Sequence, residues 1–518
     1  MNICLIKPPI LHKGISFARM ATPPIGLAYI AAALKKAGHT LSVIDASALG
    51  IKQVEHYSND IYLFGLNKHQ IAELVPPNSH VIGLTLMFTN NWLYDRELIS
   101  FLKQQFPQTK IVVGGEHATA AYELCFSQSA IDFLVRGEGE DTIVELMDAL
   151  ELNKPVSEVN GIVYKSDGKL EKTASRNRNR KLDNITWPAW ELFQLENYFD
   201  HKISFGVYRG RTLPVVATRG CPYECTFCSN PQMWGRLYQM RSPIDFVNEL
   251  EHFQKLYNIQ NFDLYDLTAI VKKEWILSMC KEIVARNLQI TYQLPSGTRS
   301  EAIDYEVAQW LYKSGCKNIS YAPESGSEIV LKQIKKKVSI SNMLQSIKYS
   351  CKAGLNVKLN MIMGFPDDTH RDIWSSFWFL IKASWYGAND AAPAIFSPYP
   401  GSELFDKLVK EGELDISNDS FLFENIDTYD LFPARVYSRN ISSFVIRAYI
   451  LFFLVVFYGS NYIFRPWRLF RTLYNLAINR HESRTEQLIY HNFLKNIFVI
   501  PDLIKRRIRK FLNPASPV

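Results

Sequence analysis

Two features common in secreted proteins are missing from this chain of 518 residues. The N-terminus, MNICLIKPPI, has no apolar run long enough for a signal peptide and predicts a strand instead. The eight cysteines also lack the paired spacing of a disulfide framework, because all but three are scattered singly in apolar or helical settings. We therefore expect a protein of the reducing cytoplasm.

Acidic residues are scarce at one end of the chain only. From Arg439 to Val518 there are 13 Lys and Arg against 3 Asp and Glu, a net charge of +10. The whole chain carries +7, which leaves about −3 for residues 1–438. The basic character therefore belongs to the C-terminal tail.

The three remaining cysteines stand close together in VVATRGCPYECTFCSNPQMWG. Cys221, Cys225 and Cys228 have the spacing C-x3-C-x2-C, and no fourth Cys or His stands beside them. A closed zinc site takes four ligands, and the nearest histidines, His201 and His252, lack zinc-finger spacing. A structural zinc site is the weaker alternative, and the trio predicts a metal site with one open coordination position.

The first third of the chain alternates short apolar runs with helical patterns. One helix begins at the prolines of PPIGLAYIAAALKKAG and ends at Gly38. This alternation predicts a doubly wound, Rossmann-like parallel sheet over residues 1–150, and such sheets bind ligands beyond the carboxyl ends of their strands. The residues expected at those ends are Pro8, Pro9, Thr85, Thr89, Gly114, Gly115, Glu116, His117, Gly137, Glu138, Gly139 and Glu140. The alternative is that these glycines only form tight turns.

Residues 151–205 predict a linker that contains a hairpin. Its basic run, Arg176–Lys181, could bind nucleic acid, but no aromatic residues are interleaved with it. A solvated spacer is the favoured interpretation, and we expect no nucleic-acid partner.

Residues 206–410 again alternate predicted strands and helices. The strands lie in segments such as NFDLYDL, NISYAPESG and NVKLNMIMGFP, and most end in polar or glycine-rich residues. Such repeats curl into a barrel or part of one, whose chemistry lies at the carboxyl ends of the strands. We predict an α/β protein with a partial (β/α) barrel here and an α-helical region over residues 411–518.

Three thiolates on one loop can hold three irons of a 4Fe-4S cluster and leave the fourth iron free for an external ligand. From Leu213 to Pro400 the chain resembles the radical S-adenosylmethionine superfamily, in which such a loop follows the first barrel strand. The resemblance implies a 4Fe-4S cluster and S-adenosylmethionine as cofactors. The residues it assigns to S-adenosylmethionine are Phe227, Arg299, Glu324, Ser325, Gly326 and Gly364.

The segments PPIGLAYIAAAL, GGEHAT and VRGEGE, placed ahead of such a barrel, resemble the cobalamin-binding domain of the cobalamin-dependent class. That class includes C-methyltransferases and the anaerobic magnesium-protoporphyrin ester cyclase. The resemblance assigns cobalamin to Pro9, Thr85, Thr89, Gly114, Gly115, Glu116, His117, Gly137, Glu138 and Gly139. PPILHKG stands where cobalamin mutases carry D-x-H-x-x-G, so we expect no histidine below the cobalt and take His12 and His117 as turn or pocket residues.

The resemblance implies reductive cleavage of S-adenosylmethionine to a 5′-deoxyadenosyl radical, which abstracts hydrogen from an unactivated carbon. Methylcobalamin, regenerated from a second S-adenosylmethionine, then methylates that carbon. One alternative is a radical oxidative cyclisation or rearrangement of a lipid or tetrapyrrole-like substrate without methyl transfer. Another, from a different class, is a non-catalytic metal-binding scaffold attached to a membrane. The expected partners are a small-molecule substrate and a reductant such as flavodoxin or ferredoxin.

The tail contains the uncharged run AYILFFLVVFYGSNYIF, Ala448–Phe464, between Arg447 and Arg465. Three interpretations remain open: a short membrane span, a helix buried against the barrel, and a helix in a membrane interface. The neighbouring Trp467 and the later KRRIRK favour contact with an anionic membrane. We therefore expect a peripheral enzyme on the cytoplasmic face, with a lipid or isoprenoid substrate.

Overall fold

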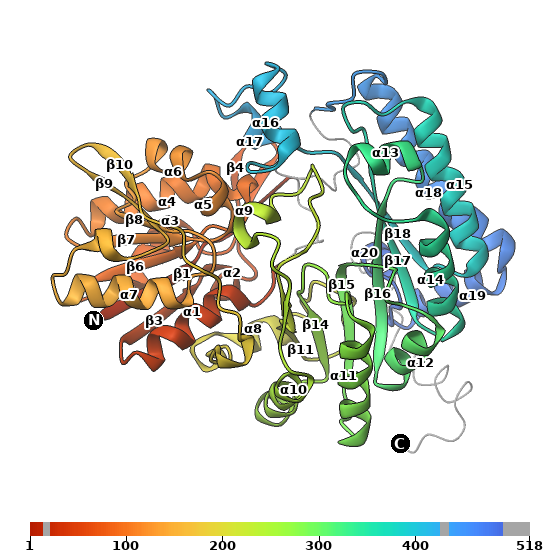
Figure 1. The fold of residues 1–518 in the computed structure, drawn as a ribbon, viewed down its shortest axis with the longest axis horizontal. Coiled ribbons are helices and arrows are strands. Elements are labelled where there is room, and N and C mark those ends of the chain that lie inside the picture. Colours follow the sequence, from red (N-terminus) through yellow and green to blue (C-terminus); the bar gives the residue numbers. More distant parts are fainter. Residues whose placement is uncertain (14–20, 425–434, 491–518) are drawn as a thin grey trace.

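The computed structural model describes residues 1–13, 21–424 and 435–490. It contains two α/β units followed by a helical region, which confirms the predicted fold class (Figure 1). The first unit lies on the left of Figure 1, and the second occupies the middle and right. The basic run KRRIRK of the tail lies outside the described residues.

Five neighbouring strands of the first sheet are parallel, in the order β8-β7-β6-β1-β3, with β3 at one edge. They are β1 (Asn2–Lys7), β3 (Thr40–Asp45), β6 (Val81–Thr85), β7 (Lys110–Gly114) and β8 (Phe133–Val135). Ile3 and Leu5 of β1 pack with helices α1 (Ile25–Lys36) and α7 (Glu140–Glu151), whereas Cys4 and Ile6 pack with α4 (Trp92–Gln105). Successive side chains of a strand leave on opposite faces, so both faces of this sheet are covered, as the doubly wound prediction requires.

The segment predicted as a linker is more structured than expected. Its hairpin, β9 (Ile162–Ser166) and β10 (Lys169–Lys172), joins the first sheet because β9 pairs antiparallel with β8. Arg178, predicted to be solvated, has a side chain only 13% exposed. Its guanidinium donates to Glu138 of the first unit and to the carbonyl of Trp234, which follows the cysteine trio. At Arg178 the basic run therefore connects the two units and is not a solvated spacer.

A small antiparallel sheet that the sequence analysis missed flanks the first unit. It has the order β2-β5-β4, with β2 (Ile10–Lys13), β4 (Val54–Ser58) and β5 (Ile61–Phe64). β4 and β5 form a hairpin whose turn residue Asn59 has a φ of 49°. Asparagine tolerates this left-handed conformation, which is the local signal for the turn.

The second sheet has six parallel strands in chain order, and its two edge strands are not paired with each other. They are β11 (Thr212–Val215), β14 (Asn261–Leu264), β15 (Thr291–Thr298), β16 (Cys316–Glu324), β17 (Asn356–Met363) and β18 (Asp390–Ile395). The helices that connect them cover its outer side in Figure 1: α10 (Pro243–Tyr257), α11 (Lys273–Ala285), α12 (Tyr305–Lys313), α14 (Ile340–Lys352) and α15 (His370–Tyr386). The carboxyl ends of these strands therefore meet at one edge of an open sheet.

The described part of residues 411–518 is helical. Its helices are α17 (Ser420–Glu424), α18 (Ser443–Phe464), α19 (Trp467–Ala477) and α20 (Arg484–Ile489), and α16 (Glu403–Lys410) precedes them. α18 runs beside α15, and α20 is tied to β18 because Asp390 accepts hydrogen bonds from Tyr458, Arg484 and Thr485. Among the described residues, α18 is the one helix long and apolar enough to cross a membrane.

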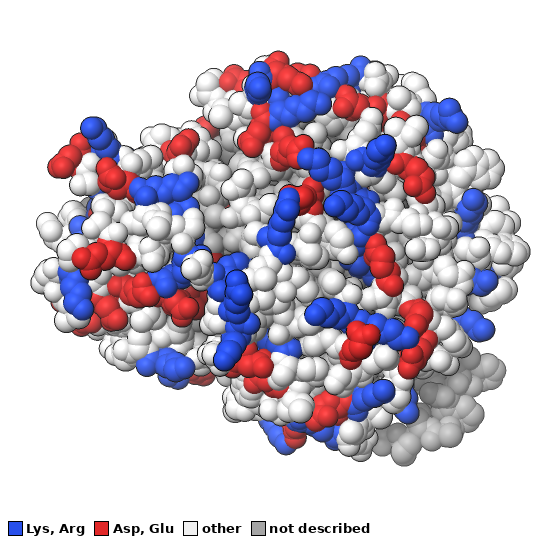
Figure 2. All heavy atoms as spheres, in the orientation of Figure 1, with Lys and Arg blue, Asp and Glu red and all other residues white. Residues whose placement is uncertain are grey.

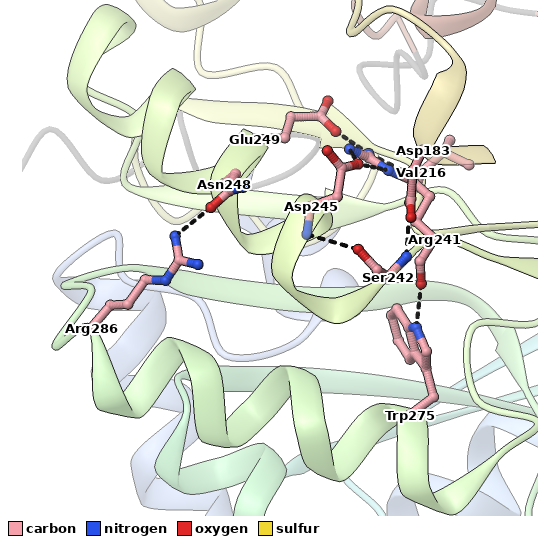
Figure 3. A network of polar contacts seen from close by, with 9 residues as sticks. All are labelled: Asp183, Val216, Arg241, Ser242, Asp245, Asn248, Glu249, Trp275 and Arg286. Atoms are coloured by element: carbon pink, nitrogen blue, oxygen red, sulfur yellow. Dashed lines mark hydrogen bonds and ion pairs between the residues drawn. The ribbon is translucent and has the colours of Figure 1, made fainter. Parts of the chain in front are cut away.

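A buried polar network holds the start of the second unit together (Figure 3). The Arg241 side chain is 5% exposed and pairs with Glu249, which is fully buried, and with Asp245, both on α10. The Arg241 backbone N–H donates to Ala217, and its carbonyl accepts from the Trp275 indole at 2.6 Å. The segment that precedes the cysteine trio is therefore fixed to two outer helices.

Removing one partner of this network is expected to destabilise the protein strongly. Glu249→Ala leaves the Arg241 guanidinium buried without its carboxylate and should lower the free energy of unfolding by about 3–5 kcal/mol. Arg241→Met combined with Glu249→Leu removes both charges and should cost clearly less. Urea unfolding followed by circular dichroism measures both. Glu251→Ala, on the same helix near the surface, is the control and should barely move the midpoint. Equal losses for the single and double variants would contradict this account.

Candidate functional site

The three cysteines lie on a loop between two short paired strands, β12 (Thr218–Arg219) and β13 (Gln239–Met240). All three are half-buried, and burial raises the pKa of the Cys228 thiol to about 12. The loop is held from both sides, because Thr226 N–H donates to Ile334 and its carbonyl accepts from Leu404 N–H. Within the described residues, no group of three His, Cys, Asp or Glu side chains is gathered into a metal-binding arrangement, the cysteine trio included.

Arg219, two residues before Cys221, connects the loop to the first unit. Its side chain is 6% exposed and donates to Glu138 at 3.1 Å and to Glu140 at 2.6 Å. Burial by itself raises the pKa of the Glu140 carboxyl, but Arg219 outweighs burial and holds that pKa below its usual value. The start of the loop is therefore locked to the residues that follow β8.

Glu324, at the end of β16, lies in a strained backbone conformation. Its φ is 62°, a left-handed value that costs a non-glycine residue on the order of 1–3 kcal/mol. Its carboxylate accepts from the Lys336 ammonium at 2.7 Å, where the Lys336 side chain is 11% exposed, and that nitrogen stands 6.0 Å from the centre of the Phe227 ring. Burial lowers the pKa of Lys336, but Glu324 and Cys225 outweigh it and raise that pKa. The Lys336 ammonium therefore stays charged beside the cysteine loop.

The other residues assigned to S-adenosylmethionine lie around this centre. Arg299 is buried and stacks 3.7 Å from the ring centre of Tyr223, in the cysteine loop. Ser325 and Gly326 pack against α15, where Gly326 N–H donates to Ser376 at 2.9 Å. Gly364 has a φ of 81° and begins a turn in which the Asp368 carboxylate accepts hydrogen bonds from the N–H groups of Gly364 and Phe365. These four residues position neighbouring segments and do not line the cavity described below.

The first unit presents three of its predicted residues toward the cysteine loop. Glu116 accepts a hydrogen bond from the Ser229 hydroxyl, next to Cys228. His117 is buried, and its Nδ1 lies 3.0 Å from the Thr89 hydroxyl. Burial lowers the pKa of His117 to about 3, so its imidazole is neutral at physiological pH. Its Nε2 is buried without a hydrogen-bond partner among the described residues.

The remaining residues assigned to cobalamin shape the carboxyl ends of the strands. Pro9, Thr85 and Gly114 take part through their backbones. The Pro9 carbonyl accepts from the Asn91 side-chain amide, and the Gly114 carbonyl accepts from the Leu86 N–H. Thr85 of β6 pairs with Gly114 of β7 in the sheet. Gly137 and Glu138 line a second cavity of about 300 Å³, together with Arg178, Arg219 and Trp234. A Cβ at Gly139 would stand 2.9 Å from Ile30, so this glycine allows α1 to approach closely.

A cavity of about 420 Å³ lies where the two units meet. Thr89, Glu116 and His117 line it from the first unit, and Phe227, Cys228 and Glu324 from the second. Its wall on the second sheet includes four small residues, Gly297, Ala322, Ala392 and Ala394, beside the larger Asn360, Met361, Ile362 and Ile395. Barrel interiors are usually filled by bulky branched side chains, so these positions leave space for a ligand of small-molecule size.

The residues around this cavity fit the groups that the resemblance implies. The donor set on the loop is three thiols, which suits an iron-sulfur cluster with one open position. His117 lines the cavity, and its buried Nε2 lacks a hydrogen-bond partner among the described residues. Buried polar atoms are nearly always satisfied in native proteins, so a ligand with hydrogen-bonding groups is expected near this nitrogen.

Several residues of the site were missed by the sequence analysis. Met87, Asn360 and Tyr399 line the cavity, and Lys336 pairs with Glu324. The alternation of alanines in AAPAIFSPYP was the available signal for an open interior, because Ala392 and Ala394 occupy positions where bulky residues would fill it. Lys336 had no local signal, since it stands in the ordinary charged run KQIKKK.

Two domain families match the chain. The B12 binding domain matches residues 16–147, and the radical SAM superfamily matches residues 215–380. The first match covers the carboxyl ends of β6, β7 and β8, and the second covers the cysteine loop and the strands up to β17.

Relatives and a solved structure agree with this domain order. An uncharacterized methyltransferase of Pyrococcus horikoshii is 28% identical over 88% of this chain and 93% of its own length. The anaerobic magnesium-protoporphyrin IX monomethyl ester cyclase of Rubrivivax gelatinosus is 26% identical over 79% of this chain and 70% of its own. The radical S-adenosylmethionine methyltransferase TsrM of Kitasatospora setae, with cobalamin and a [4Fe-4S] cluster bound, has a TM-score of 0.61 at 15% identity. That comparison covers 79% of this chain and 78% of TsrM, and it shows a shared fold.

The loop after β7, which leads into α5 (Glu116–Ala120) with Glu116 and His117, is expected to depend on Gly115. Gly115 has a φ of 121°, and a Cβ there would stand 2.5 Å from the Leu86 carbonyl oxygen. Gly115→Ala should therefore displace the loop and weaken binding of hydroxocobalamin by at least about ten-fold, measured by absorbance titration. Gly168→Ala is the matched control, because Gly168 also has a positive φ (76°) but no atom within 4 Å of a Cβ. Equal affinity of the two variants would contradict the assignment of this loop.

Proposed function

Because the chain combines a B12-binding domain with a radical SAM domain, we propose that it is a cobalamin-dependent radical S-adenosylmethionine enzyme that methylates an unactivated carbon. The observation that carries this proposal is the shared cavity. Residues of both domains line it, so a ligand of one domain can meet a ligand of the other there. The proposed reaction needs a radical formed at one cofactor and a methyl group transferred from the other. Both cofactors must therefore lie within reach of the same substrate carbon.

Cys221, Cys225 and Cys228 are the proposed ligands of a 4Fe-4S cluster, and Glu324 and Phe227 lie beside them as proposed contacts of S-adenosylmethionine. When bound, the cluster supplies the electron that cleaves S-adenosylmethionine to a 5′-deoxyadenosyl radical, and cobalamin supplies the transferable methyl group. The Lys336 ammonium pairs with Glu324 and orients its carboxylate, which can also accept hydrogen bonds from the hydroxyl or amino groups of S-adenosylmethionine.

The first domain offers a lining suited to a large, amide-rimmed ligand. Gly115 allows the backbone to turn closely against Leu86, just before Glu116 and His117 reach the cavity, and Thr89 and the neutral His117 supply hydrogen-bonding groups. Ser229 lines the cavity and joins Glu116 to the cysteine loop, so the lining of the first domain is tied to the cluster loop.

The proposal places the reaction in the cytoplasm, where thiol ligands remain reduced. A low-potential electron carrier such as flavodoxin or ferredoxin is the proposed reductant. The substrate is a small molecule, for which a lipid or isoprenoid is the proposed class.

Replacement of the three loop cysteines by alanine is expected to abolish reductive cleavage of S-adenosylmethionine. Without thiolate ligands the cluster cannot be held, so iron content and 5′-deoxyadenosine should both fall to background in anaerobically purified protein. Cys351→Ala is the matched control, because Cys351 is also half-buried but lies on α14, outside the loop. Formation of 5′-deoxyadenosine by the triple variant in the presence of a reductant would contradict the proposal.

A second candidate function is supported by the cyclase relative, whose identity of 26% is close to the 28% of the methyltransferase relative. In this alternative the radical starts an oxidative cyclisation or rearrangement of a lipid or tetrapyrrole-like substrate, with no methyl transfer. The cavity walls are compatible with both reactions, because both need a substrate carbon beside the S-adenosylmethionine pocket.

The two functions differ in the fate of the methyl group of S-adenosylmethionine. With S-adenosylmethionine labelled in its methyl group and hydroxocobalamin supplied, methyl transfer predicts S-adenosylhomocysteine together with 5′-deoxyadenosine, and label in the product. The alternative predicts 5′-deoxyadenosine alone. Mass spectrometry of reactions with extracts of candidate substrates measures all three, and absence of S-adenosylhomocysteine in every reaction that forms 5′-deoxyadenosine would favour the alternative.

A further inference from the structure

The outer side of α15 carries a stripe of exposed tryptophans. Trp374, Trp378 and Trp385 are 48%, 62% and 61% exposed. They recur at the spacing of one helical face, and Arg371 and Lys382 are exposed on the same side. The opposite side of α15 is buried against the second sheet.

α18 and α19 extend this apolar surface. Phe444, Leu451, Phe452, Val455 and Ile463 are exposed on α18, and Trp467, Leu469, Phe470 and Leu473 on α19. The surface is continuous, because the Trp374 ring lies 5.8 Å from Phe452 and the Trp385 ring 5.1 Å from Phe464. We call these twelve exposed side chains of the three helices the tryptophan face; the helices run side by side at the right of Figure 1.

The charges near the tryptophan face are almost all positive. From Ser443 to Ala477 the sequence has four arginines and no Asp or Glu. On α15, Asp372 is buried and bonded to Ser327, whereas Arg371 and Lys382 are exposed. Arg471 pairs with Glu482 beyond the end of α19. In Figure 2 the right-hand edge over these helices is mainly white, with blue spheres between.

α18 lies along the protein and is anchored there. Ile446, Ile450, Phe453 and Phe457 bury its inner face, and the Asn461 amide donates to the Ser384 hydroxyl at 3.0 Å. Tyr458 donates to Asp390 at 2.7 Å. A membrane-spanning position would break these contacts and expose Asn461 and Tyr458 to lipid, so the structure favours the interfacial interpretation of this helix over the spanning one.

We propose that the tryptophan face docks the enzyme on the surface of an anionic lipid bilayer, with α15, α18 and α19 lying in the interface. Tryptophan rings suit this position because they combine a large apolar body with an N–H that stays near the headgroups. The cations around them complement acidic headgroups. A second copy of the chain is a poorer occupant, because a two-fold contact would bring Arg371 and Lys382 of each copy against like charges.

The test uses the full chain, without cofactors, and flotation with vesicles of phosphatidylcholine alone or with added phosphatidylglycerol. The wild type should float with the anionic vesicles at about 0.05 M salt and less at about 0.5 M. Trp378→Ser, Val455→Ser and Phe470→Ser together should reduce the floated fraction at least about five-fold. Leu152→Ser, Ile244→Ser and Leu256→Ser form the matched control, because these side chains are 60%, 59% and 58% exposed just after α7 (Leu152) and on α10 (Ile244 and Leu256). The control should float like the wild type.

Quenching of tryptophan emission by brominated lipids identifies the surface that meets the bilayer. Four of the ten tryptophans belong to the tryptophan face, and residues 491–518 contain none. Quenching of the wild type and its loss in the face variant support the proposal. Flotation without quenching would assign membrane binding to the basic tail and overturn it. A dimer in light scattering that the face variant dissociates, without flotation of the wild type, would overturn it in favour of a second copy. None of these readouts depends on the proposed reaction.

Discussion

The buried ion cluster of Arg219 with Glu138 and Glu140 is the constraint on which the arrangement of the two domains depends. Arg219 belongs to the strand that leads into the cysteine loop, and its two carboxylate partners belong to the loop and helix that follow β8. A guanidinium buried to this degree is costly unless its charge is matched by good partners. The domains therefore have to meet in the orientation that brings the two glutamates to Arg219. Arg178 reinforces this contact, because it shares Glu138 and also holds the carbonyl of Trp234.

The cavity follows from that orientation and from small side chains. The cysteine loop is carried against the first domain, where Ser229 meets Glu116. The interior of the second sheet stays open at its carboxyl edge because alanine and glycine stand where bulky residues would close it. Glu324, at this edge, has a strained left-handed backbone, whereas Gly115 in the first domain adopts a positive φ that glycine tolerates. Strain at such positions is retained where the surrounding structure holds it, as it does in functional loops.

α15 joins the proposed reaction site to the proposed membrane surface. Its inner face contacts the segment after Glu324, where Ser376 bonds to Gly326 and Asp372 to Ser327. Its outer face carries the three tryptophans. A helix with its side chains is about 10 Å across. One layer of helices therefore separates the proposed membrane surface from the second sheet, and a substrate drawn from the bilayer would need to pass around that layer alone. An apolar substrate held in a membrane would suit this arrangement.

The sequence by itself determined the alternation of strands and helices, the doubly wound first domain and the cysteine trio, because each is written in local periodicity or spacing. Arg178 and Lys336 could not be identified in this way: both stand in charged runs that predict solvated surface, and only the folded chain brings them to Glu138 and Glu324. The tail shows the same limit. Its hydrophobic run was evident, but the sequence could not separate a span from a buried or interfacial helix. That choice depends on which side of α18 meets α15, and side-chain contacts between helices distant in the chain are set only by tertiary packing.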